Sequence, residues 1–288
     1  MMAIVCTGLM LGLLVFSHAA MAAALAAAHC FVNGVLPALL PMVVLGKMLP
    51  DCTKNERSPL GRWLELTLFS FAAGSPASAQ RAAGRREAFS ERDWECLLCL
   101  TGVMSPMFFT GTLAGWLGSA RDGWLLLGLH WLGAAVTAGL WRVLSTADKA
   151  SAGAARRTPA DKTALPQAIA QSAQSLLCVC GAMMVFSVAA ALVRSLLGAI
   201  FPAWTARHAD WLAVLWAVME IGGGSNGVIR TCAHPQALLS ALCGFGGLSI
   251  WLQNLLFLEK SIRPAKLLAM RALHGAVCYA LVRAFSLF

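Results

Sequence analysis

Long apolar segments fill most of the chain, and short glycine- and serine-rich stretches interrupt four of them. Two interruptions lie in the first half, over residues 71–79 and 100–109, and two lie in the second half, over residues 219–227 and 243–250. Paired interruptions in the two halves of a membrane chain are typical of transporters, in which unwound backbone lines a polar cavity. The pattern therefore predicts a binding site where the interruptions meet.

The lengths of the apolar segments predict an all-α polytopic membrane protein, because a helix needs about 20 apolar residues to cross the hydrocarbon core. Two runs, residues 60–80 and 211–229, are shorter and end in the interruptions, so we interpret them as two re-entrant hairpins. The longer runs predict about seven spans, which we place at residues 2–28, 31–49, 94–119, 121–144, 167–194, 235–258 and 264–286.

Basic residues cluster within residues 81–92, 142–162 and 260–271, next to apolar segments. The positive-inside rule favours a cytoplasmic position for all three clusters. An even number of membrane crossings must then separate each pair of clusters. This holds only if each of the two short runs turns back to the side from which it entered the membrane. Each half then follows the order span, hairpin, broken span, span, with opposite orientations. We therefore expect an inverted-topology repeat, divided into an N-terminal transmembrane helix (1–30), a first membrane repeat (31–144), a cytoplasmic linker (145–166) and a second membrane repeat (167–288).

Composition supports membrane insertion, since 12% of the residues are charged and 59% are hydrophobic, against about 25% charged in soluble domains. The net charge of +9 comes from residues beside apolar runs, so we expect the lipid bilayer and not nucleic acid as partner. Cys96 and Cys99 have CxxC spacing but no second pair nearby, so no metal is expected. The common nucleotide-binding and hydrolase motifs are absent, which predicts a protein that is not an enzyme and uses no cofactor.

The first 28 residues are apolar, and no Lys or Arg precedes them, which favours a transmembrane helix over a signal peptide. Cleavage of this segment stays open as the alternative.

Glu220 is the sharpest candidate for function, because a carboxylate at membrane depth is costly and marks a functional site by default. It stands between the apolar run 211–219 and the glycine-rich stretch 222–227. It could bind a polar substrate, a coupling cation or a proton. The structural alternative is that Glu220 caps the break or pairs with Arg230.

Small polar residues at the four interruptions complete the predicted substrate-binding set. Ser225 and Asn226 follow Glu220, although both residue types also form plain turns. Further candidates are Ser75 and Ser78 at the first hairpin, and Ser105 and Gln253 in the two broken spans. A helix that restarts after the proline at position 76 would present free N–H groups to an anion, so the predicted solute is small and either polar or anionic.

His130 lies alone within the run 121–144, and we expect it to be hydrogen-bonded to a neighbouring helix rather than to carry protons.

Several of these stretches resemble the YlbJ-type sporulation integral membrane proteins, which carry the nucleoside-recognition (Gate) domain. The resemblance covers about residue 30 to the end. The run Gly222-Gly-Gly stands where a Thr or Asn commonly follows the Glu-Ile pair in that family. The stretches that carry it are Val35-Leu-Pro-Ala-Leu-Leu-Pro-Met, Gly74-Ser-Pro-Ala-Ser-Ala-Gln, Ser105-Pro-Met-Phe-Phe-Thr-Gly, Met219-Glu-Ile and Gly244-Phe-Gly-Gly-Leu-Ser-Ile-Trp-Leu-Gln.

This resemblance implies a multi-pass protein of the bacterial plasma membrane in an endospore-forming host, with a role in spore cortex formation. Together with the interruptions, it leads us to expect a permease-like protein for a small solute, with a homo-oligomer left open. The alternative is a membrane scaffold that does not transport and recruits envelope or cortex machinery through basic loops, such as those around Arg85 and Arg156.

Overall fold

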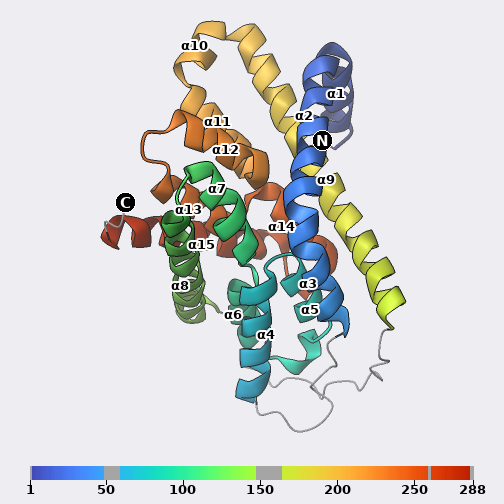
Figure 1. Cartoon of the computed structure of the whole chain (residues 1–288), viewed down its shortest axis with the longest axis vertical. Helices are drawn as coiled ribbons and strands as arrows, with labels where there is room; N and C mark the ends of the chain where they lie inside the picture. Colours follow the sequence, from blue (N-terminus) through green and yellow to red (C-terminus); the bar gives the residue numbers. More distant parts are fainter. Residues whose placement is uncertain (1, 49–58, 147–163, 259–260, 286–288) are drawn as a thin grey trace.

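A computed structural model describes residues 2–48, 59–146, 164–258 and 261–285, and these residues form helices and no strand (Figure 1). The first half contains α1 (Met2–Val15), α2 (Ser17–Cys30), the π-helix η1 (Phe31–Val35), α3 (Leu36–Met48), α4 (Pro59–Ala73), α5 (Ala77–Ala83), the 3₁₀ turn η3 (Arg86–Ala88), α6 (Glu91–Thr101), the π-helix η4 (Phe108–Leu113), α7 (Ala114–Leu117) and α8 (Ala120–Leu144). The second half contains α9 (Leu165–Ile200), α10 (Pro202–Arg207), α11 (Ala209–Met219), α12 (Ile221–Thr231), α13 (Gln236–Phe245), α14 (Gly247–Leu258) and α15 (Pro264–Phe285). The all-α prediction is confirmed.

Five helices among the described residues are long and apolar enough to cross a membrane: Ser17–Met48, Ala120–Leu144, Leu165–Ile200, Gln236–Leu258 and Pro264–Phe285. Their surfaces expose large apolar side chains, among them Leu25, Leu140 and Leu177. Extensive exposed apolar surface is unfavourable in water and favourable against lipid acyl chains. The fold is therefore that of an integral membrane protein of the all-helical class.

The N-terminal region differs from the expected pair of spans 2–28 and 31–49. No loop separates them, because α2, η1 and α3 continue as one helix from Ser17 to Met48. The chain bends earlier, at Phe16, whose backbone leaves the helical region (φ −111°, ψ 38°). The 14 residues of α1 extend about 21 Å, less than the roughly 30 Å hydrocarbon core. Residues 2–28 thus do not form one straight span.

The two short runs fold as helical hairpins broken at their glycine-rich stretches. The helices α4 and α5 meet at Gly74, which has a positive φ of 72°. The helices α11 and α12 turn at the single residue Glu220 and pack closely, so that a Cβ at Gly224 would overlap the backbone of Ala217. The linker expected over residues 145–166 lies largely outside the described residues.

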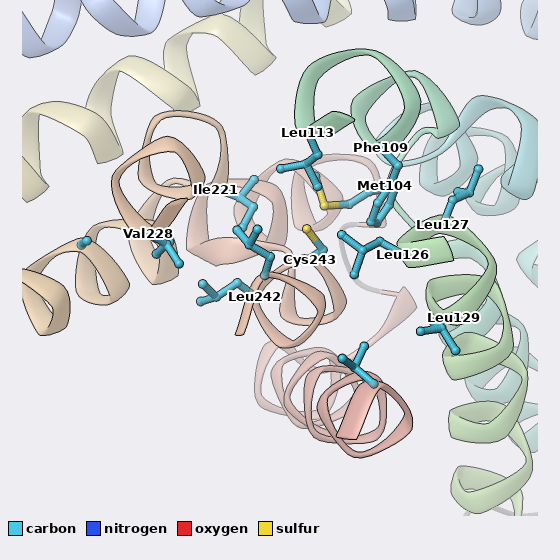
Figure 2. Close-up of a cluster of buried hydrophobic side chains, with 14 residues drawn as sticks. Met104, Phe109, Leu113, Leu126, Leu127, Leu129, Ile221, Val228, Leu242 and Cys243 are labelled. Atoms are coloured by element: carbon cyan, nitrogen blue, oxygen red, sulfur yellow. The ribbon is translucent and has the colours of Figure 1, made fainter. Parts of the chain in front are cut away.

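The apolar core joins both halves of the chain. Met104 and Phe109 from the first half pack with Ile221, Val228 and Leu242 from the second, as Figure 2 shows. A separate cluster holds α3 against α9, which lie side by side. The helices α8 and α15 also cross in contact, where a Cβ at Gly133 would lie 2.6 Å from the sulfur of Cys278. The core consequently positions the interruptions of one half against those of the other.

One residue of the expected basic cluster at 260–271 is not at a surface. Arg271 on α15 is 1% exposed, and its guanidinium donates hydrogen bonds to the carbonyl oxygens of Leu98 and Gly102. These carbonyls end α6 and have no partner within their own helix. Arg271 thus caps the broken helix α6 and does not contribute to a cytoplasmic loop.

Candidate solute-binding cavity

The two interruptions of the first half touch each other through their backbones. The N–H of Ser75 donates to the carbonyl oxygen of Val103 over 2.7 Å. A Cβ at Gly74 would overlap the backbone nitrogen and Cα of Ser105 and would lie 2.8 Å from the carbonyl carbon of Met104. The first hairpin therefore needs glycine at its break in order to approach the break after α6.

The two interruptions of the second half meet in a comparable way. Gly246 separates α13 from α14, and both Gly246 and the first residue of α14, Gly247, have positive φ values, of 84° and 76°. A Cβ at Gly247 would lie 3.3 Å from both the carbonyl oxygen of Ala217 and the backbone nitrogen of Ile221. In each half, then, the break of the hairpin packs against the break of the neighbouring helix.

All four interruptions contribute to one cavity of about 80 Å³. A water molecule in the liquid occupies about 30 Å³, so the cavity has room for a few waters or a small solute. The helices α2 and α3 line its other sides together with η1, η4 and α9. The polar or ionisable lining residues are Cys30, Ser75, Ser105, Thr112, Glu220, Ser249 and Gln253, among mainly apolar neighbours such as Val35, Phe108, Val179 and Met183.

Glu220 is 2% exposed and caps α12, as its structural alternative predicted. Its Oε1 accepts the N–H of Gly222 over 2.8 Å, and its Oε2 accepts the N–H of Gly223 over 2.7 Å. The positive end of a helix dipole stabilises a negative charge at this position. Each carboxylate oxygen still has a second lone pair, because an ionised carboxylate accepts about four hydrogen bonds. The side chain can therefore cap the helix and bind a ligand in the cavity.

Other polar lining groups have hydrogen-bonding capacity to spare. Ser249 is 0% exposed, and its hydroxyl meets no partner within the described part of the chain. Ser75 donates its hydroxyl proton to Asn254 Oδ1 on α14, which links the first hairpin to the second half. A buried hydroxyl without a partner is unfavourable by about 1–3 kcal/mol, and a bound solute would remove that cost.

Three of the seven predicted ligands do not line the cavity. Ser78 donates to the carbonyl oxygen of Thr101 over 2.5 Å, and Ser225 donates to that of Ile221 over 2.6 Å. Asn226 accepts from Nε of Arg230 over 3.2 Å. Ser78 and Ser225 therefore hold the backbone at the breaks, whereas Ser75, Ser105, Glu220 and Gln253 line the cavity.

Cys30, Thr112 and Ser249 line the cavity but were not in the predicted substrate-binding set. Ser249 follows a Gly-Gly pair much as Ser105 follows a helix break, and this parallel could have identified it. Thr112 lies within the π-helix η4, and nothing in its neighbourhood in sequence distinguishes it.

His130 belongs to a second buried polar group, at the crossing of α8 and α15. Its Nε2 accepts the N–H of Met104 over 3.0 Å, and its carbonyl oxygen lies 3.2 Å from His274 Nε2. His130, His274 and Cys278 place potential metal-ligating atoms within 4.8 Å of one another. However, the Met104 N–H occupies one lone pair of His130, and the nearby Arg271 guanidinium repels cations. This group therefore fits a structural role better than a metal site.

Comparison of the chain with models of protein families, with curated proteins and with solved structures finds no match.

Proposed function

We propose that this chain is a permease-like protein that binds a small polar solute in the cavity between its four interruptions. The observation that carries the proposal is that residues of all four breaks line one cavity and include a buried carboxylate and a hydroxyl with no partner among the described residues. Transporters commonly bind substrates at such discontinuous helices.

The same packing supports an inverted-topology repeat. In the first half, Gly74 approaches the backbone of Ser105, and in the second, Gly247 approaches that of Ile221. The pairs α3 with α9 and α8 with α15 each bring an element of one half against its proposed counterpart. Under this proposal, α4–α5 and α11–α12 are the re-entrant hairpins, and rocking of one repeat against the other alternates access to the cavity.

The lining favours a neutral polar or cationic solute over an anionic one. Glu220 is the one charged group among its described residues, and no Lys or Arg side chain lines it. The anion site was expected where the helix restarts after the proline at position 76, but there the N–H of Ser78 is already bonded to the carbonyl oxygen of Gly74 over 3.1 Å. Glu220 also offers a place for a coupling proton or cation.

The scaffold alternative receives less support from the structure. Arg81 and Arg85 lie in the first basic cluster, and both form ion pairs with Glu65, at 2.7 and 2.9 Å. These contacts hold α4 against the end of α5 within the hairpin and leave the two arginines less available to a partner protein. The loop with Arg156 lies outside the described residues. A role in spore cortex formation follows from the resemblance to YlbJ-type proteins and belongs to this proposal.

Two buried serines provide a matched test. Ser249 lines the cavity, and its hydroxyl has no partner among the described residues. Ser225 is equally buried, at 0% exposure, but its hydroxyl donates a hydrogen bond within α12, to the carbonyl oxygen of Ile221. In an endospore-forming host that depends on this protein, Ser249→Ala and Glu220→Gln should lower the yield of heat-resistant spores at unchanged protein level, and Ser225→Ala should not. Glu220→Gln keeps one carbonyl acceptor for the helix cap, so the fold should lose only about 1 kcal/mol. Full sporulation with both cavity variants would refute the solute site.

A further inference from the structure

A second and larger cavity, of about 350 Å³, lies on the flank of the α11–α12 hairpin, away from its Glu220 tip. The C-terminal part of α9 and the short helix α10 close its other side. Figure 1 shows α10 at the C-terminal end of α9. None of its lining residues also lines the solute cavity. A pocket of this size is large enough for a small molecule.

The donors in this cavity are suited to an anion. Arg194 on α9 lines it and has no acidic partner within the described residues. Trp216 also lines it, and its buried indole N–H meets no acceptor among the residues that the structure describes. Thr205 and Thr231 donate their hydroxyl protons to the carbonyl oxygens of Pro202 and Gly227, over 2.9 and 3.0 Å. The unused donors are thus a guanidinium and an indole, and the ligand must supply the acceptors.

The rest of the cavity and its surroundings are apolar. Leu212, Ala213 and Gly198 contribute to the wall. Trp204 and Trp211 are exposed beside it, at 47% and 66%. Exposed tryptophans near the end of an apolar helix are typical of the membrane–water interface. An arginine in this position can bind headgroup phosphates while its stem stays in apolar surroundings.

We propose that this cavity binds a phosphate group, supplied by the headgroup of an anionic phospholipid or by free phosphate, with Arg194 as the charged ligand and Trp216 as a second donor. The apolar wall and the exposed tryptophans favour the lipid as the source. Because Trp216 and Gly227 belong to the hairpin and Arg194 belongs to α9, a bound phosphate would bridge these two elements.

Native mass spectrometry of the purified full chain, with phosphatidylglycerol or phosphatidylcholine added to the detergent, tests the proposal. Arg194→Gln should weaken retention of phosphatidylglycerol about fivefold, the size of one arginine–headgroup interaction. Arg207→Gln is the matched control, because Arg207 is an exposed arginine on α10 that does not line the cavity. Arg194→Lys should restore most of the retention, which separates loss of charge from loss of fold.

Titration with inorganic phosphate separates the two sources. If the lipid is the ligand, phosphate should leave phosphatidylglycerol bound and should not bind by itself. Displacement of the lipid, with phosphate binding that depends on Arg194, would keep the anion site and assign it to free phosphate. Equal retention of phosphatidylglycerol by wild type, Arg194→Gln and Arg207→Gln, together with no phosphate binding that depends on Arg194, would overturn the proposal.

Discussion

Gly74→Ala tests the close approach between the first hairpin and the break after α6. Gly74 has a φ of 72°, and a Cβ there would overlap the backbone of Ser105. An L-residue with left-handed φ is destabilised by about 1–2 kcal/mol. Overpacking in a filled interior adds about 1–3 kcal/mol. The backbone of Ser105 cannot rotate away as a side chain could, so the variant should lose roughly 2–5 kcal/mol of stability in total.

Gly118→Ala is the control, because Gly118 has a similar φ of 66° but a Cβ there would meet nothing within 4 Å. It should lose only the backbone part, about 1–2 kcal/mol. The assay is unfolding of each purified variant by SDS in mixed micelles, followed by tryptophan fluorescence, with the free energy compared to wild type. The difference between the two alanine variants isolates the contact with Ser105. If both lose the same stability, the two breaks do not touch and the derived geometry is wrong.

Three further predictions use the same unfolding assay. Arg271→Met should destabilise the protein by about 2–4 kcal/mol, because the carbonyls that end α6 lose their donors; a loss no larger than that of a surface substitution would contradict the capping role. Lys266→Met should destabilise it by about 1–3 kcal/mol, since Glu95 is 1% exposed and loses its ion pair, and adding Glu95→Gln should recover part of the loss; no recovery would mean that the lysine acts in another way. Ser249→Ala should change stability by less than about 0.5 kcal/mol, or raise it, because its hydroxyl has no partner within the described residues; a large loss would reveal an unrecognised hydrogen bond.

Local signals in the sequence located the breaks well. Gly74, Gly246 and Gly247 adopt positive φ at the predicted interruptions, and Glu220 turns the chain at the end of the run 211–219. Glycine is the residue that adopts such backbone angles at little cost, so its clusters mark breaks reliably. The hairpins were therefore predictable from residues close together in the chain.

The boundary between the first two spans was predicted at the wrong place, because no glycine cluster marks the actual bend. Nothing between residues 28 and 31 forces a loop, and the chain continues there as a helix with one π-helical segment. The actual bend at Phe16 has no glycine or proline beside it that would have marked it in the sequence.

Contacts between residues far apart in the chain could not be predicted from the sequence. Arg271 looked like a loop residue, but its hydrogen-bond partner Gly102 lies 169 positions earlier in the chain. Likewise, Ser249 and Glu220 become members of one cavity only after the core has packed the two halves together. By contrast, Ser225 looked like a ligand from its position and instead bonds to its own helix.

The most direct test of the central claim is cysteine accessibility in a variant depleted of native cysteines. Single cysteines would replace Ser75, Ser105 and Ser249 in the cavity, with Ser225 as the buried control and Ala120 as the exposed control. A small charged methanethiosulfonate reagent should label the three cavity positions and Ala120→Cys, and should leave Ser225→Cys unmodified. If Ala120→Cys alone reacts, water does not reach the four interruptions, and they are helix contacts without a solute path.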